Sequence, residues 1–441
     1  MKTFIIIWFG QFISRIGTSM TRFALLIWVY EQTGSATSVA MLGFAAFLPM
    51  ILISPFAGVW IDRLDRRNIL IFSDLGAGLM TVMMLILAAS GNLQLWHLYL
   101  AEAVAGAFEA FQIPAYTAVI STLMPKEQYG RANGLRSLAD FGAQVLAPAL
   151  GGFCLVWIGL SGVMLLDVIT FLAAISTLLL VRIPQIINEA ALSSGSLFRR
   201  DLRVGFSTIW QDKGLAALVA ISLLIHFCAA FTWMSIMPAM ILARSGNDEL
   251  ALASVQSAMG LAGVLGGLTM SIWGGPQRKI HGFLLGLVFS FLLGDMIMAL
   301  GRSLPLWIIG ASLGSFFIPI LIGSREAIWQ SKIPQSMQGR VFSARDMMAN
   351  TLLPVGYVLA GVLADRVLEP AMAVDGWLAP TFGWLVGVGL GAGMALMFLG
   401  TAVSAILITL SAYLFPAIRQ VEDDDLSISH TRFLYPNPLI D

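Results

Sequence analysis

Two pairs of like charges occur at matching intervals inside apolar stretches of this chain. Arg15 and Arg22 are seven residues apart, and Glu102 and Glu109 repeat that interval. Seven residues make two turns of an α-helix, so each pair lies on one helix face, about 10 Å apart along the axis. An ionised side chain at mid-membrane costs about 2.5 to 3.5 kcal/mol, which a partner of opposite charge can offset. If the two helices run in opposite directions, the spacing predicts a ladder of two ion pairs, Arg15 with Glu109 and Arg22 with Glu102.

The proton is the ligand that this ladder could carry, and Glu109 is the better candidate to bind it. A carboxyl shielded from water by apolar neighbours can exchange protons in a useful pH range. The alternative is a static salt bridge between packed helices. Gln112, Asp140 and His226 complete the set of residues expected to bind substrate or protons. Asp140 is spaced to pair with Arg136 one turn away, and His226 is either a proton relay or a hydrogen-bonded packing residue.

A second group of charges is expected to act in gating. Arg325 and Glu326 are adjacent, as are Arg345 and Asp346, and both pairs are predicted near the cytoplasmic ends of two consecutive helices. The alternative is local pairing of side chains that reach toward the membrane surface. Three isolated acids expected near span ends or motif loops receive no role, namely Asp74, Asp167 and Asp295.

The elements that must position these residues are membrane-spanning helices. The 441 residues are 58% hydrophobic and 11% charged, whereas soluble domains are about 25% charged. Apolar runs long enough to cross a bilayer recur along the chain. The prediction is an all-α integral membrane protein with twelve transmembrane helices in two pseudo-symmetric six-helix bundles. The expected spans are residues 3–30, 36–61, 68–90, 94–123, 129–155, 159–182, 214–243, 250–273, 280–301, 305–331, 337–365 and 379–415.

The distribution of basic residues predicts the orientation. Most of the 25 Lys and Arg residues fall in loops on one side, whereas the other side carries only Arg244, Arg302 and Arg366. Because cytoplasmic loops are enriched in Lys and Arg, both termini are expected in the cytoplasm and the protein in the inner (plasma) membrane.

An internal repeat predicts the division into halves. The segment PKEQYGRANGLRSLADF from position 125 resembles PQSMQGRVFSARDMMAN from position 334, 209 residues later. The longest cytoplasmic connection falls between them, which indicates a tandem repeat of six spans. The expected units are an N-terminal bundle, a linker, a C-terminal bundle and a cytoplasmic tail, at residues 1–182, 183–213, 214–415 and 416–441.

The sequence lacks the motifs typical of ATP binding, metal binding and nucleophilic catalysis. The chain has no phosphate-binding Gly-x-x-x-x-Gly-Lys-Ser/Thr loop, no paired-histidine metal motif and no nucleophile elbow. Cys154 and Cys228 are expected as buried apolar residues inside spans. The protein is therefore expected to be no enzyme, to use no cofactor and to draw its energy from a proton gradient. Its expected partners are a small-molecule substrate and the lipid bilayer, with no nucleic acid, and it is expected to act as a monomer.

The stretch GVWIDRLDRRNIL resembles the loop signature of the major facilitator superfamily. Gly58, Asp62, Arg63, Arg66 and Arg67 match Gly-x-x-x-Asp-Arg-x-Gly-Arg-Arg/Lys, and an aspartate replaces the second glycine. The resemblance implies a cytoplasmic clasp in which the acid at position 62 faces the start of the eleventh helix. For the basic pair at 66 and 67, the alternative is a topology signal alone.

A second stretch, AQVLAPALGG, resembles the antiporter signature of that superfamily. Pro148, Gly151 and Gly152 match it, and they could reshape a cavity by bending the fifth helix or serve ordinary close packing. GAFEAFQIPAYTAVI and GSREAIWQSKIPQSMQGRVF resemble the macrolide-efflux-like branch. The resemblance implies proton-coupled efflux of amphipathic drugs or natural products by alternating access. The alternatives are a dedicated exporter of one metabolite such as a siderophore or peptide, for which an arginine-rich cavity favours anionic or mixed-charge cargo, an uptake carrier, and a non-transporting sensor or assembly factor.

Overall fold

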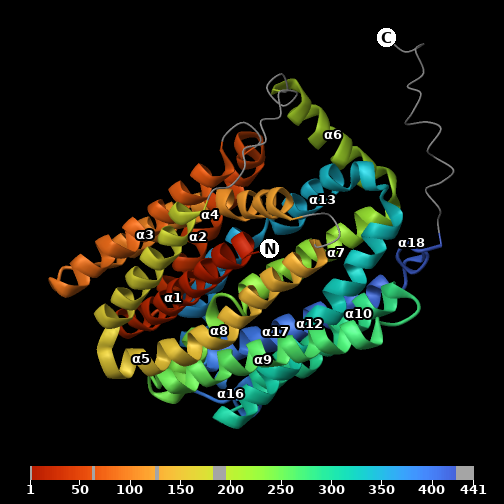
Figure 1. Ribbon diagram of the computed structural model, residues 1–441. Helices are drawn as coiled ribbons and strands as arrows, with labels where there is room; N and C mark the ends of the chain where they lie inside the picture. Colours follow the sequence, from red (N-terminus) through yellow and green to blue (C-terminus); the bar gives the residue numbers. More distant parts are fainter. Residues whose placement is uncertain (1, 62–64, 125–128, 182–194, 424–441) are drawn as a thin grey trace.

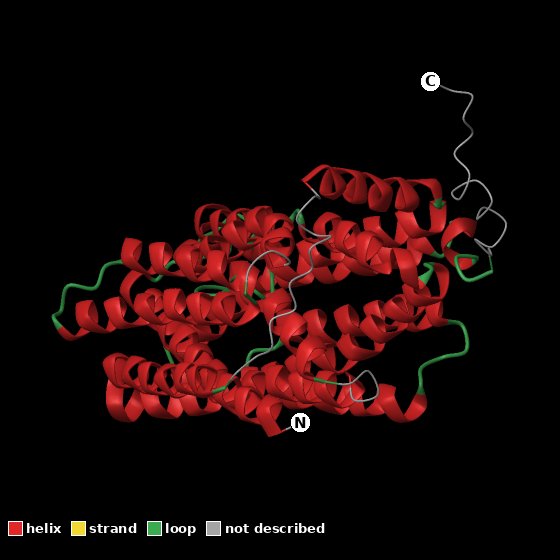
Figure 2. Cartoon of the chain, turned by 45° about the horizontal axis from the view of Figure 1, so that its top comes forward, coloured by secondary structure: helices red, strands yellow, loops and turns green. Residues whose placement is uncertain are grey.

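The computed structural model describes residues 2–61, 65–124, 129–181 and 195–423, and those residues form helices and the turns between them (Figures 1 and 2). In these ranges, nine helical segments are long and apolar enough to cross a membrane. The prediction of an all-helical membrane fold is confirmed.

The N-terminal half is built from long helices. Asp65 accepts a hydrogen bond from the backbone N–H of Arg67 at 2.9 Å and so caps α3. Gly159, with φ +67°, interrupts α5 at the first residue of the expected span 159–182, just after the expected span 129–155. The helices are α1 (Lys2–Thr33), α2 (Ala36–Ile61), α3 (Arg66–Ala89), α4 (Leu95–Leu123) and α5 (Tyr129–Leu180).

The C-terminal half contains more interruptions. It comprises α6 (Gly195–Gln211), α7 (Lys213–Phe231), α8 (Ile236–Ser245), α9 (Glu249–Trp273), α10 (Lys279–Phe289), the π-helix η3 (Ser290–Asp295), α11 (Met296–Leu300), α12 (Leu304–Lys332), α13 (Gln335–Asn350), α14 (Leu353–Leu363), the π-helix η4 (Ala364–Leu368), α15 (Glu369–Ala371), α16 (Ala379–Val386), α17 (Ala392–Ala412) and α18 (Pro416–Arg419).

The start of the last expected span, 379–415, is wrong. Gly387, Gly389 and Gly391 have φ values of +89°, +94° and +78°, which end α16 and delay the membrane helix to α17. The expected linker 183–213 includes α6, and its Ile209 is buried in an apolar core with residues of α7, α10 and α13. Figure 1 shows α6 lying beside α13.

The two ends of the bundle differ in charge and in packing. We call the end where helices begin or end at Lys2, Lys213, Lys279 and Lys332 the basic face, and the opposite end the far face. Toward the far face, buried apolar side chains of α1, α2, α8, α9 and α17 form one core that joins both halves. Toward the basic face, the described residues form separate cores, two in the N-terminal half and one in the C-terminal half, and none of these three joins the halves. The two halves are therefore packed together most closely at the far face.

Candidate functional site

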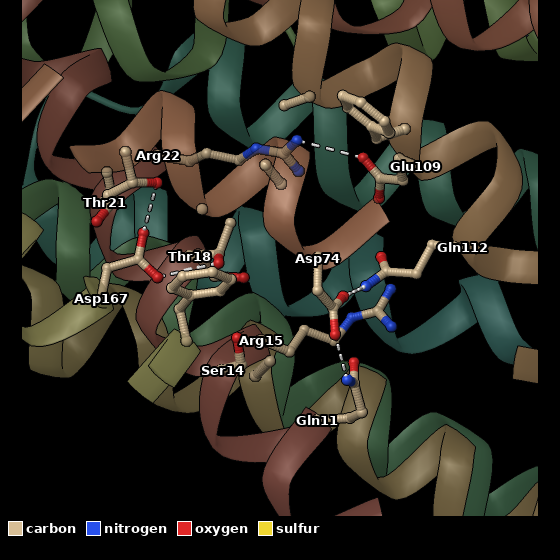
Figure 3. Close-up of a pocket in the computed structure, with 18 of the residues that line it drawn as sticks. Gln11, Ser14, Arg15, Thr18, Thr21, Arg22, Asp74, Glu109, Gln112 and Asp167 are labelled. Atoms are coloured by element: carbon tan, nitrogen blue, oxygen red, sulfur yellow. Dashed lines mark hydrogen bonds and ion pairs between the residues drawn. The ribbon is translucent and has the colours of Figure 1, made fainter. Parts of the chain in front are cut away.

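A cavity of about 310 Å³ lies inside the N-terminal half, lined by α1, α3, α4 and α5. Figure 3 shows polar side chains from these helices pointing into it. The described lining includes three guanidiniums and five carboxyls, namely Arg15, Arg22, Arg136, Asp74, Glu102, Glu109, Asp140 and Asp167. All four members of the expected ladder line this cavity, together with residues of α3 and α5.

Arg22 of α1 binds both glutamates of α4. Its Nε lies 3.3 Å from a carboxylate oxygen of Glu102, and its Nη2 lies 3.2 Å from one of Glu109. The side chain of Glu102 is 10% exposed and that of Glu109 is 28% exposed. The expected Arg22–Glu102 pair is present, and Glu109 is the more accessible of the two carboxylates.

The expected pair between Arg15 and Glu109 is wrong. Nη1 of Arg15 instead lies 3.0 Å from a carboxylate oxygen of Asp140 on α5. The reason is that α1 packs mainly along α5 and touches α4 over a short stretch. Matching depths in the membrane therefore do not make Arg15 and Glu109 neighbours. Asp140 pairs with an arginine of α1 and not only with a residue of its own helix α5.

Asp74 of α3 lies between two amides. It accepts hydrogen bonds from Nε2 of Gln11 at 2.6 Å and from Nε2 of Gln112 at 2.5 Å. Gln112 thus lies in the cavity, as expected, and Asp74 is a cavity acid for which the sequence predicts no role. Its signal in the sequence was an acid within an apolar helix, the same signal that identified the glutamates.

Asp167 of α5 is a second cavity acid for which the sequence predicts no role. It is 1% exposed and accepts hydrogen bonds from the hydroxyls of Thr18 at 3.0 Å and Thr81 at 3.3 Å. Asp74 and Asp167 thus receive hydrogen bonds from neutral donors, whereas the other three acids contact arginines. The described lining carries more carboxyls than cations.

The second expected group of charges is joined across two helices. Glu326 of α12 lies 3.1 Å from Arg325 and 2.8 Å from Arg345 of α13, which in turn lies 2.8 Å from Asp346. The guanidinium of Arg345 also stacks over Trp329, 5.4 Å from the ring centre. The four residues form one network, and gating by that network stays a prediction.

His226 lies outside the cavity. Its Nδ1 is 3.2 Å from the carbonyl oxygen of Ala349, so it joins α7 to α13. This contact fits the packing role that the sequence left open beside proton relay.

The described part of the loop motif acts within its own half. The guanidinium of Arg67 donates hydrogen bonds to the carbonyls of Leu178 at 3.0 Å and Leu179 at 2.8 Å, which caps the end of α5. Gly58 and Arg66 lie in α2 and α3. Asp62 and Arg63 lie outside the described residues, so the cytoplasmic clasp stays a prediction.

The proline and glycines of the fifth helix face two neighbours. Pro148 lies inside α5. A Cβ on Gly151 would lie 3.2 Å from Phe23 of α1, and one on Gly152 would lie 2.8 Å from Ala253 of α9. Gly152 therefore permits close contact between the halves, which agrees with the packing interpretation; gating at this point stays a prediction.

Comparison with known proteins agrees with this architecture. Over 375 residues the chain is 28% identical to macrolide efflux protein A of Streptococcus pyogenes, covering 82% of this chain and 90% of that protein. It is 23% identical over 375 residues to the multidrug efflux pump Tap of Mycolicibacterium fortuitum, covering 82% and 89%. A solved bacterial homologue of the human lysosomal transporter Spinster has a TM-score of 0.67 at 16% identity, covering 96% and 99%. The sequence profile of the Major Facilitator Superfamily matches residues 7–356, and the chain belongs to that superfamily.

Proposed function

We propose that the protein is a proton-coupled exporter of amphipathic small molecules, working by alternating access in the plasma membrane. Relatives named as macrolide and multidrug efflux pumps support the export of drug-like molecules. The concentration of Lys and Arg at the basic face supports a cytoplasmic position for that face and for both termini. The proton gradient supplies the energy, no cofactor takes part, and the monomer is the working unit.

The observation that carries this proposal is the surplus of carboxyls in the cavity. Five carboxyls and three guanidiniums line its described part. A buried charge without a partner is unfavourable, so such a cavity gains from binding protons or a cationic substrate. This competition between protons and substrate for the same charge is what exchange of the two requires.

The shared guanidinium supplies a way for a proton to change the cavity. Protonation of Glu109 removes one of the two negative charges that hold Arg22. The guanidinium then pairs with Glu102 alone, and the cavity loses the negative charge that attracts a cation. A proton entering from one side thereby favours release of the substrate to that side.

The same charge balance defines a substrate class. An amphipathic molecule with an amine fits a cavity whose carboxyls outnumber its cations, and apolar lining from Met80, Met84 and Phe108 provides contact for its hydrophobic part. The surplus of carboxyls therefore favours a cationic substrate over the anionic substrate that an arginine-rich cavity would select.

Reconstituted vesicles test the proposal. We expect efflux of an amphipathic amine to accelerate under a pH gradient that is acidic on the release side, and an ionophore that collapses the gradient should abolish this acceleration. A matched anionic compound should move slowly. Transport that ignores the gradient, or that prefers the anion, contradicts the proposal.

The variant Glu109→Gln tests the residue assigned to the proton. We expect it to reach the membrane folded, with a chromatographic profile like that of the wild type, and to lose gradient-driven efflux because the glutamine cannot exchange a proton. Unchanged gradient-driven efflux would show that Glu109 does not carry the proton.

A further inference from the structure

Asp295 is a buried acid in the C-terminal half, away from the described cavity. It is 1% exposed and ends the π-helix η3. It lies against residues 232–235, where the chain leaves α7 before entering α8. Single-turn π-helices and broken membrane helices both occur frequently at functional sites.

The hydrogen bonds around Asp295 are unequal at its two oxygens. Oδ2 accepts a hydrogen bond from Nε1 of Trp233 at 2.8 Å. Oδ1 lies 3.5 Å from the hydroxyl oxygen of Thr232 and 3.4 Å from that of Thr401. Both contacts are long for hydrogen bonds between two oxygens, so their character depends on which acceptor each hydroxyl proton faces.

Each threonine hydroxyl has one proton and a closer acceptor than Asp295. The Thr232 hydroxyl lies 2.9 Å from the carbonyl oxygen of Cys228, and the Thr401 hydroxyl lies 3.0 Å from that of Phe398. A carbonyl oxygen can only accept a hydrogen bond. Each hydroxyl can donate either to Asp295 or, over a shorter distance, to the backbone. When both protons take the shorter bonds, the hydroxyl lone pairs face Oδ1.

An oxygen that faces two acceptors is satisfied when it carries a proton itself. Among the described residues, no Lys, Arg or His forms an ion pair with Asp295. The titratable group close to it is the thiol of Cys228. Burying an ionised carboxylate without a cation is costly. Asp167 differs, since the hydroxyls of Thr18 and Thr81 donate to it.

We propose that Asp295 is a second proton-binding site, which holds a proton on Oδ1 in the state described here and releases it once in each transport cycle. This inference rests on the proposed proton coupling. On release, the hydroxyls of Thr232 and Thr401 rotate to donate to the new carboxylate. The carbonyl of Cys228 keeps the backbone N–H of Thr232 at 3.0 Å, so rotation leaves it bonded. The broken segment 232–235 is the element that rearranges.

Infrared spectroscopy of the full-length protein tests the protonation directly. In protein that carries isotope-labelled aspartate, we expect the wild type to show the carbonyl stretch of a neutral carboxylic acid. This band should be absent in Asp295→Asn, and the wild type should lose it at alkaline pH. Asp375→Asn, which alters an exposed acid, should leave the band unchanged. A wild type without this band from acid to alkaline pH overturns the proposal, and this measurement needs no folded variant.

Transport by Asp295→Asn tests whether the proton takes part in the cycle. Asparagine accepts from Trp233 and donates to the threonines, so it imitates the protonated acid and should fold. We expect this variant to exchange labelled for unlabelled substrate at near the wild-type rate. Its accumulation of substrate against a concentration gradient, measured with a pH difference, should fall to the level that the wild type reaches without a pH difference. Gradient-driven accumulation equal to the wild type overturns the proposal.

The two proposals fail in different ways. If wild-type transport ignores the pH gradient, proton coupling fails for the whole protein, and the part of Asp295 in the cycle fails with it, whatever its infrared band. If the wild type is gradient-driven and Asp295→Asn is equally so, only the role of Asp295 fails. Asp295→Glu, which keeps an exchangeable proton, should retain part of the coupling and serves as the conservative variant.

Discussion

Arg22 is the residue on which the charges of the cavity converge. Its Nε faces Glu102 and its Nη2 faces Glu109, so two different nitrogens of one planar group serve two carboxylates. A guanidinium can do this because its donors are fixed in a fork, whereas an ammonium is a single compact charge. Arg15 has the simpler task of one ion pair through Nη1 to Asp140. The two arginines therefore form a matched pair for testing the bridging geometry.

Replacing Arg22 by Lys should impair transport far more than replacing Arg15 by Lys. Both variants keep the charge, but only Arg22→Lys loses a bridge. A lost hydrogen bond to a charged group costs about 1.5 to 3 kcal/mol, so the initial efflux rate should fall about tenfold or more. Arg15→Lys should stay within a few-fold of the wild type. Efflux from vesicles with equal protein content measures this, and equal rates for the two variants would show that bridging has no part in transport.

The pairing of side chains was predictable only in part. Helical spacing placed Arg22 at the depth of Glu102, and the two do pair. Arg15 pairs with Asp140 instead of Glu109, because a spacing gives depth and helix face but not the neighbouring helix. Asp74 and Asp167 lacked a basic residue at a matching interval, and their partners are glutamines and threonines, which carry no charge signal.

At the scale of elements, helices approach closely where one of them lacks a side chain. A Cβ on Gly106 of α4 would collide with the backbone carbonyl of Ala46 on α2, and a Cβ on Gly266 of α9 would collide with that of Phe316 on α12. These contacts involve the second and fourth expected spans of each half. Small residues that admit a neighbouring backbone are a major source of helix association in membranes. The halves thus use the same device at equivalent pairs of helices.

The variant Gly106→Ala should lower thermal stability because the added methyl group forces α2 and α4 apart. Overpacking of this kind costs about 1 to 3 kcal/mol. Gly400→Ala in α17 is the control, since a Cβ there meets nothing within 4 Å. Alanine is also the better helix former, so this control should keep or raise the melting temperature. Melting in detergent, followed by circular dichroism, measures both. An unchanged melting temperature for Gly106→Ala would contradict the close approach of α2 and α4.

The positions of most helices followed from apolar length, but their interruptions did not. The π-helices at 290–295 and 364–368 mix apolar residues with Asp295 in the first and with Asp365 and Arg366 in the second, and this composition does not distinguish them from α-helix. The expected span 379–415 began too early because its first residues are as apolar as those of α17. The glycines at 387, 389 and 391 are the sequence signal for a break in this span, and their positive φ values end the helix there.

At the scale of the whole molecule, the far face holds the two halves together. Asp365 in η4 accepts hydrogen bonds from the hydroxyl of Ser35 at 2.6 Å and from the backbone N–H groups of Ala36 and Thr37 at 3.0 and 2.8 Å. These groups begin α2 in the other half, so a carboxylate faces the positive end of a helix dipole. With the basic face in the cytoplasm, as proposed, the protein is closed toward the outside.

This contact is the counterpart of the clasp expected from the loop motif. There, the acid at position 62, just after α2, is expected to face the start of the eleventh helix on the cytoplasmic side. At the far face, an acid at the end of that eleventh helix faces the start of α2. The same two helices would then exchange roles when the protein changes state, each closing one side of the membrane.

Asp365→Asn should therefore shift the protein toward states that are open at the far face. The amide keeps the shape but loses the charge that interacts with the N-terminus of α2, a loss of about 1 to 2 kcal/mol. A change of that size alters the ratio of two states about 5- to 30-fold. Spin labels at the exposed positions Gln32 and Ala373, one in each half, should report a second and longer distance in this variant. Asp375→Asn removes an exposed acid from the same face and should leave the distances unchanged. If the two variants give the same distance distribution, the contact at Asp365 does not control closure, and the exchange of roles between α2 and the eleventh helix loses its support at this face.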